Sequence, residues 1–278
     1  MRFLRTLLMI LLAGAIGGCG SVNLRSVRQA GSLVDFMYPK ATSAPVMTPA
    51  VTELHPPVRV GIAFVPGTNR NMGPSEAERL QLLERVKAAF SSQPYIGKID
   101  LIPSSYLRPG GGFDNLDQVA RMFDVEVVAL LSYDQIRFND TNAAAVLYWT
   151  IVGAYVIQGD RYDVQTLLDA AVFDVKSRKL LFRAPGTSQV KGSATWAGLT
   201  EQARAAQSQG YAQAVDQLIP QLQSELGNFR ERVKSDPQFR VANKAGYKGG
   251  GSAGWLAALG ALALLLIGHA RGRARRRG

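Results

Sequence analysis

The chain has few of the side chains on which most catalytic and metal sites depend. Its 278 residues include one cysteine, Cys19, and two histidines. His55 lies in a proline-rich stretch and His269 lies beyond the last apolar run, so neither is expected in a folded domain. A Ser-His-Asp triad and a histidine-based zinc site are therefore excluded from that domain, and an internal disulfide needs a second cysteine. We expect a domain that is not an enzyme and holds no metal or cofactor.

Acidic residues are absent from both ends of the chain. The formal net charge of +11 would by itself suggest a nucleic-acid or membrane-surface binder. However, Arg2 and Arg5 precede Cys19, and five more arginines follow Ala253, with no Asp or Glu in either end. Removing these seven charges leaves +4 for residues 19–252, which is ordinary for a soluble domain. Nucleic acid is therefore not an expected partner.

The first 18 residues have the pattern of an export signal. Arg2 and Arg5 form a basic start, and Leu7–Ile16 is an apolar run of signal-peptide length. The following Ile16-Gly17-Gly18-Cys19 resembles the lipobox of bacterial lipoproteins, which implies cleavage by signal peptidase II and acylation of the Cys19 thiol. Gly20, where retained lipoproteins often carry Asp, implies sorting outward from the inner membrane. The alternative is an ordinary secretory signal in which the cysteine is incidental.

The C-terminal end contains a second membrane-directed segment. A small-residue stretch, Gly249–Ser252, precedes an apolar run, Trp255–Ile267, and a cluster of arginines. A bilayer crossing needs about 20 helical residues, with a range of about 17–25. The 18 residues of Ala253–Ala270 can therefore just span, with the arginines on the cytoplasmic side.

This tail resembles the GlyGly-CTERM sorting domain. Proteins with that tail are cut by rhombosortase, an intramembrane serine protease of the rhomboid family. The resemblance implies a cut in the precursor among the small residues Gly249, Gly250, Gly251, Ser252, Ala253 and Gly254. Because Cys19 already provides a lipid anchor, we interpret the tail as an address that is read and removed. The alternative is an uncleaved single-span anchor.

The lipobox and the tail together resemble one family, the rhombotarget lipoproteins. Tyr148–Tyr155 and Leu181–Gly186 also look like the middle of that family. The resemblance implies a precursor in the inner membrane of a Gram-negative bacterium and a mature lipoprotein at the outer membrane or cell surface. It implies no activity for the domain itself.

Composition divides the chain into five parts. The signal peptide, residues 1–18, is followed by a Pro-rich tether at 19–57 and an α/β domain at 58–236. A linker at 237–252 contains the cleavage region, and residues 253–278 form the sorting tail. Pro-rich composition makes the tether semi-extended.

Hydrophobic periodicity predicts an α/β fold for the domain. Strands are expected at Val58–Val65, Lys98–Ile102, Val125–Phe138, Val146–Gln158, Val164–Val175 and Leu180–Arg183. Helices are expected after the capping box that begins at Ser75, at Asn115–Phe123 and over 199–234, with a short one at Leu24–Tyr38. We expect a mixed sheet of about five or six strands with helices mainly on one face. The pattern resembles the periplasmic domains of the CsgG, TolB N-terminal and LpoB type.

Carboxylates leave one catalytic possibility open. Residues 114–174 of the domain contain ten candidates: Asp114, Asp117, Asp124, Glu126, Asp134, Asp140, Asp160, Asp163, Asp169 and Asp174. A pair of them could serve a glycosidase-type hydrolase, but no spacing singles out a pair. The favoured hypothesis is a non-catalytic envelope lipoprotein whose domain binds an unknown protein partner or assists envelope assembly. An envelope hydrolase with a carboxylate site is the alternative.

Overall fold

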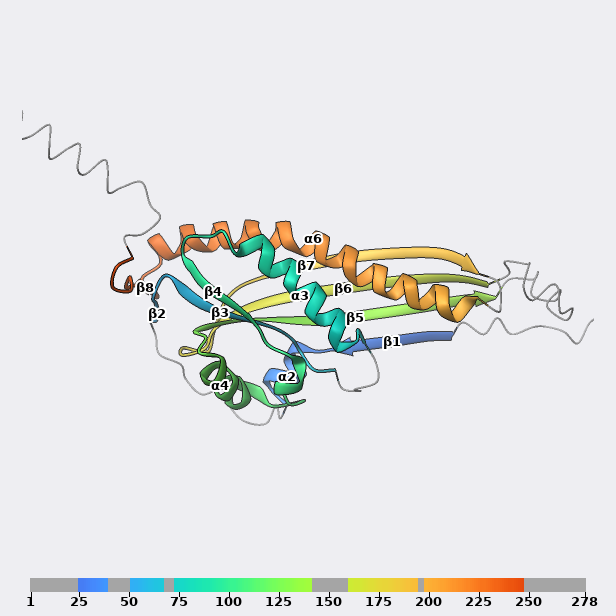
Figure 1. The fold of residues 1–278 in the computed structure, drawn as a ribbon, viewed down its shortest axis with the longest axis horizontal. Coiled ribbons are helices and arrows are strands. Elements are labelled where there is room, and N and C mark those ends of the chain that lie inside the picture. Colours follow the sequence, from blue (N-terminus) through green and yellow to red (C-terminus); the bar gives the residue numbers. More distant parts are fainter. Residues whose placement is uncertain (1–24, 40–50, 68–72, 142–159, 195–197, 248–278) are drawn as a thin grey trace, which may run out of the picture.

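The computed structural model describes residues 25–39, 51–67, 73–141, 160–194 and 198–247 (Figure 1). The predicted strand at Val146–Gln158 lies outside these residues. The strands are β1 (Arg25–Gly31), β2 (Thr52–Leu54), β3 (Val58–Phe64), β4 (Ile96–Leu101), β5 (Val127–Thr141), β6 (Asp160–Asp174), β7 (Lys179–Ala194) and β8 (Phe239–Val241). The helices are α2 (Leu33–Met37), α3 (Glu76–Phe90), α4 (Gly112–Phe123) and α6 (Leu199–Ser235).

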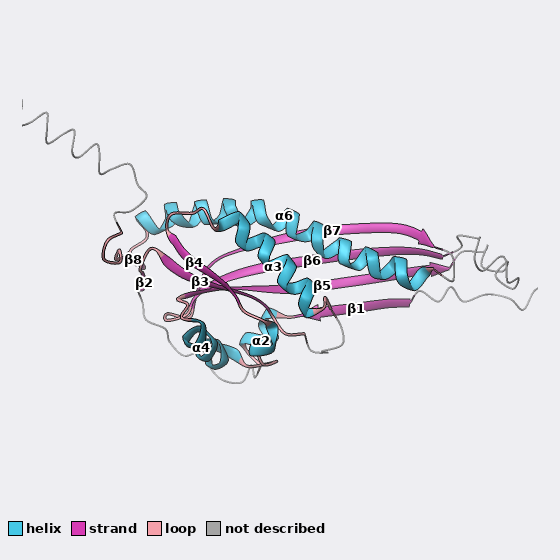
Figure 2. Cartoon of the chain, in the orientation of Figure 1, coloured by secondary structure: helices cyan, strands magenta, loops and turns pink. Residues whose placement is uncertain are grey.

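Six strands form one mixed sheet in the order β4-β3-β5-β6-β7, with β1 also paired to β5 (Figure 2). The long β5 has two neighbours along the same edge. Its first part, Val127–Leu131, pairs with β3 in parallel, and its second part pairs with β1 antiparallel, with Arg25 opposite Asn139. On its other edge β6 and then β7 follow as antiparallel partners, and β4 pairs in parallel with β3. The predicted mixed α/β sheet is thereby confirmed.

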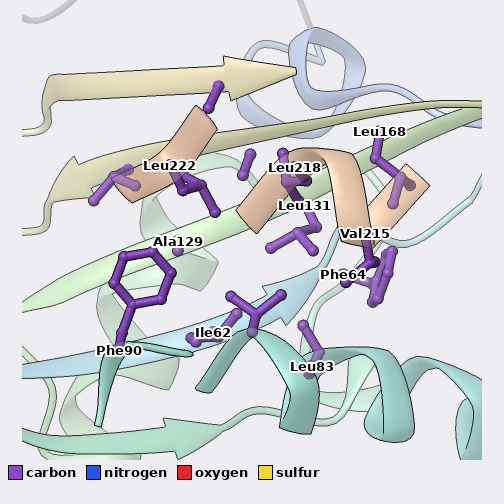
Figure 3. Close-up of a cluster of buried hydrophobic side chains, with 14 of the residues drawn as sticks. Ile62, Phe64, Leu83, Phe90, Ala129, Leu131, Leu168, Val215, Leu218 and Leu222 are labelled. Carbon is purple, nitrogen blue, oxygen red and sulfur yellow. The ribbon is translucent and has the colours of Figure 1, made fainter. Parts of the chain in front are cut away.

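Helices cover both faces of the sheet, so the expectation of helices mainly on one face was wrong. Side chains of a strand alternate between the faces. Ala129 and Leu131 of β5 belong to a core under α3 and α6, whereas Val128 and Leu130 belong to a second core under α2 and α4 (Figures 1 and 3). The parallel part of a sheet is usually buried on both faces, and here that part is where β3 meets β5.

The stretch expected to be a tether is partly folded. The predicted helix at Leu24–Tyr38 is instead strand β1 followed by the single turn of α2, whose Ser32 side chain accepts a hydrogen bond from the Asp35 N–H. Residues 52–54 form β2, which pairs in parallel with β8 inside the expected linker. The folded body therefore extends beyond 58–236 at both ends. Backbone pairing to distant strands, which local composition does not reveal, accounts for the difference.

The long C-terminal helix agrees with its predicted pattern. It spans 37 residues, about 55 Å at 1.5 Å per residue, and continues through Pro220. Its apolar residues recur every three or four positions from Tyr211 to Val233 and form one stripe. Tyr211, Val215 and Leu218 of this stripe are buried against the sheet, so the stripe packs on the domain itself. The predicted cap of α3 is also present, since Ser75 Oγ accepts a hydrogen bond from the Glu78 N–H. Within the described residues, no helix is both long enough and apolar enough for a membrane crossing.

Candidate functional site

The residues assigned to lipidation and processing lie outside the described part of the chain. The nearest described residues are Arg25, six positions after Cys19, and Tyr247, two positions before Gly249. The strand β1 begins beside the far end of β5, whereas β8 lies near the C-terminal end of α6 (Figure 1). The segments expected to carry the lipid anchor and the sorting tail therefore adjoin opposite ends of the described body.

Most of the singled-out carboxylates are neutralised by a basic neighbour. Arg178 pairs with Asp114 and Asp117, and Arg59 pairs with Asp124 and Glu126. The others with a basic partner are Asp134 with Arg28, Asp163 with Lys191 and Asp169 with Arg183. Asp174 accepts a hydrogen bond from the Ser177 N–H at 2.7 Å. The Asp140 and Asp160 side chains lie outside the description.

Several of these carboxylates line a polar cavity that also includes His55. The expectation that His55 lies in a tether was wrong, because it follows β2 directly and faces this cavity. The other polar lining residues are Glu53, Asp117, Arg121, Asp124, Glu126, Asp174, Lys176 and Arg178. Across the described residues, no three His, Cys, Asp or Glu side chains are placed to hold a metal ion.

Glu126, which lines this polar cavity, forms hydrogen bonds and ion pairs with two other segments of the chain. Its carboxylate accepts hydrogen bonds from Lys244 Nζ at 2.8 Å and from the Arg59 N–H at 3.2 Å. Burial alone would raise the pKa of Glu126, but these hydrogen bonds and the charges of Lys244 and Arg59 outweigh burial and lower it. A general acid of a hydrolase needs a raised pKa, so Glu126 is better suited to joining β3 to the segment after β8.

A second cavity, of about 350 Å³, is almost wholly apolar. It lies between the sheet and the C-terminal third of α6, next to the end of α3. Its apolar lining residues are Leu54, Pro56, Val58, Val60, Ile62, Val86, Phe90, Ile96, Ile99, Val127, Ala129, Val172, Leu181, Phe182, Leu222, Leu226, Phe229, Val233 and Val241. Figure 3 shows Ile62, Phe90, Ala129 and Leu222 around the same space. The volume is within the range of small-molecule sites, about 300–1,000 Å³.

The sequence produces this cavity through the placement of large and small residues. Near the middle of α6, Gly186 of β7 lets the helix approach the sheet closely. Further along, the short side chain of Ala129 lies on the sheet below the predicted helical stripe. The roof is held at one side by the ring of Phe229, which contacts the rings of Phe182 and Phe239 at centroid distances of 5.5 and 5.4 Å. The space in front of Ala129 is thus framed by rigid aromatic packing.

The few polar residues of the lining gather at the mouth. Arg230 Cζ lies 4.8 Å from the ring centroid of Tyr95, and Tyr95 Oη donates to Gln93 Oε1 at 2.8 Å. Burial raises the pKa of Tyr95, and the positive charge of Arg230 opposes part of that effect. Lys234, Asn243 and Tyr247 complete the polar rim.

The cavity leaves a contiguous apolar surface of the sheet and helices without a protein partner in the described residues. Burying such surface contributes about 25 cal/mol per Å². The cavity is therefore the strongest candidate for a binding site in the described residues.

Sequence reasoning missed this site. The only signal was the last part of the helical stripe, where Leu226 and Val233 are half-buried although they keep the spacing of the buried residues before them.

Comparison with known proteins gives a faint likeness of fold. No protein-family model and no curated protein matches the chain. A solved structure of the PelC dodecamer from Paraburkholderia phytofirmans is similar at 10% identity and a TM-score of 0.26, covering 70% of this chain and 99% of that one. Lipoprotein GNA1162 from Neisseria meningitidis is similar at 15% identity and a TM-score of 0.24, covering 53% of this chain and 94% of that one.

Proposed function

We propose that the chain is a non-catalytic envelope lipoprotein whose domain binds an apolar group of another envelope component in the cavity under α6. The observation that carries this proposal is the cavity itself, lined by apolar side chains from five strands of the main sheet and two helices. Filling it with an apolar group buries the apolar surface of the lining. A binding protein without catalytic activity needs no more than such an apolar binding site.

The proposal includes the two processing events expected from the sequence. Signal peptidase II and acylation act at Cys19, and rhombosortase cuts between Gly249 and Gly254. The opposite exits of the two ends support removal of the tail. The six residues that separate Arg25 from Cys19 span at most about 20 Å when fully extended, whereas α6 alone is about 55 Å long. A chain held at both ends must keep its long body against one membrane, whereas loss of the tail frees the β8 end.

Photolabelling tests the cavity as a binding site. An uncharged aryl diazirine is added to membranes that contain the full chain, and labelled peptides are mapped by mass spectrometry. We expect label in residues 222–234 of α6. Ala129→Leu, which fills the space, reduces this label about tenfold, because each buried methylene contributes about 0.8 kcal/mol to binding. Ala205→Leu, the same change on the exposed side of α6, leaves it intact. Equal labelling in both variants would overturn the cavity as the site.

A further inference from the structure

The cavity runs along α6. Its lining includes Leu222 and Lys234 of α6, twelve residues apart, which is about 18 Å along a helix. Apolar side chains form almost all of the lining, and the cavity is partly open to solvent. An extended hydrocarbon chain can lie along such a lining and bury its surface there.

The rim of the cavity carries two basic side chains, Lys234 and Arg230. Lys234 is neutralised by Glu231, with Nζ 2.7 Å from the carboxylate. Arg230, in contrast, forms no ion pair with any carboxylate in the described residues and lies over the face of Tyr95. A guanidinium held in this way presents N–H donors to a carboxylate or phosphate group at the rim. The cavity thus combines an apolar lining with the guanidinium of Arg230 at its rim.

The entrance also lies close to a source of lipid. Tyr247 lines the cavity, and the apolar stretch that can enter a bilayer begins six residues later at Ala253. Six residues reach at most about 20 Å. While the tail is present, the entrance is therefore held within that distance of the membrane.

We infer that the cavity takes one acyl chain whose anionic head group pairs with Arg230. This inference rests on the proposed function, since it names the apolar group that the domain binds. The chain enters between α6 and the sheet, along Ala129 and Phe90, and its head group stays in solvent at the rim. Cutting the tail then separates the loaded cavity from the membrane.

A matched pair of photoreactive lipids tests the head group. Diazirine-bearing hexadecanoic acid and the corresponding hexadecanol are added separately to membranes that contain the full chain, and label in residues 222–234 is measured. We expect the acid to label about five times more than the alcohol, the ratio for an ion pair of about 1 kcal/mol at a solvated site. Arg230→Gln brings the ratio close to one. Arg204→Gln, the same charge change near the other end of α6, leaves the ratio unchanged.

The outcomes separate this inference from the proposed function. Equal cavity labelling by acid and alcohol overturns the role of Arg230, while the cavity remains a binding site. Labelling by the aryl diazirine without labelling by either lipid overturns the acyl chain as the occupant. Displacement of both lipids by a peptide of residues 255–267 would instead make the tail the occupant. Absence of all cavity label overturns the proposed function itself.

Discussion

Gly186 of β7 lies directly against the main-chain carbonyl oxygen of Ala214 in α6, so closely that a Cβ at Gly186 would collide with it. The same Cβ would lie 2.8 Å from Leu218 Cβ. Glycine at this point sets the distance between helix and sheet. The roof of the apolar cavity begins one turn further along the same helix.

Gly186→Ala is expected to destabilise the domain by about 1–3 kcal/mol, because the rigid backbone of α6 must move to admit the methyl group. Urea unfolding of the full chain, followed by circular dichroism, measures the change. Gly227→Ala is the matched control, since no atom lies within 4 Å of a Cβ built there. That variant is expected to gain about 0.5–1 kcal/mol from helix propensity. Equal effects of the two substitutions would show that Gly186 does not set the packing.

Tyr211→Phe is expected to stabilise the protein and to reduce its loss of stability in alkali. Tyr211 is 2% exposed, and its hydroxyl has no hydrogen-bond partner in the described residues. Its removal relieves about 1 kcal/mol of desolvation at neutral pH. Burial raises the pKa of Tyr211 above its usual value near 10. The folded state therefore keeps a proton that the unfolded chain releases, and stability falls as the pH rises above about 10.

Unfolding curves between pH 8 and about pH 11.5 test the Tyr211 prediction. The wild-type chain should lose stability more steeply than the variant above about pH 10, and the two slopes should agree below it. The pKa of Tyr133 is also raised by burial, so the variant keeps part of the alkaline loss. If the stabilities of the wild type and the variant changed in parallel over the whole pH range, the alkaline loss of stability would not come from Tyr211.

Glu126→Gln is expected to cost about 0.5 kcal/mol at pH 7, a small value because the side chains of Lys244 and Glu126 are 34% and 29% exposed and water screens the pair. Its pKa is lowered in the folded state, so its contribution is complete above the unfolded pKa near 4.5 and disappears as the pH falls through the folded value. The variant and the wild type should therefore differ at pH 7 and converge at about pH 3. Lys244→Met should give the same loss, and the double variant should cost no more than either single one. Additive losses would mean that the two residues act separately.

Cys19→Ser is expected to abolish acylation, because the thiol is the acceptor in the proposed lipobox. Metabolic labelling with a radioactive or alkyne-bearing fatty acid, followed by isolation of the full chain, measures the effect. Val34→Ser, an exposed change in the folded body, serves as a control that should keep the label. Label that persists in the Cys19 variant would contradict the lipobox interpretation.

The tail prediction concerns the mass of the mature chain. Intact-mass measurement in cells with rhombosortase should show loss of everything beyond a bond between Gly249 and Gly254. Cells without the protease should retain residues 255–278. A chain that keeps the tail in both strains would establish it as a permanent anchor.

Local sequence patterns were sufficient to predict those elements that depend on regular spacing of residues or on contacts between near neighbours in the chain. The stripe of α6 from Tyr211 to Val233 depends on helical spacing, and the cap at Ser75 depends on a side chain three residues from its N–H donor. The run Val58–Phe64 depends on β-branched and apolar residues. Cys19 and the glycine-rich start of the tail likewise carry their meaning in adjacent residues, and they stay predictions.

Tertiary structure decided the features that join distant residues. Arg25–Gly31 is a strand because β5 extends beyond β3 and leaves backbone groups that β1 pairs, although the sequence of β1 has little strand character. Thr52 of β2 pairs with Phe239 of β8, which follows it by 187 residues in the sequence. The apolar cavity exists because Ala129 lies beneath the roof of α6, whose height is set by Gly186. Sequence periodicity specifies which face of an element is apolar, but only packing between elements determines where that apolar surface is left unfilled.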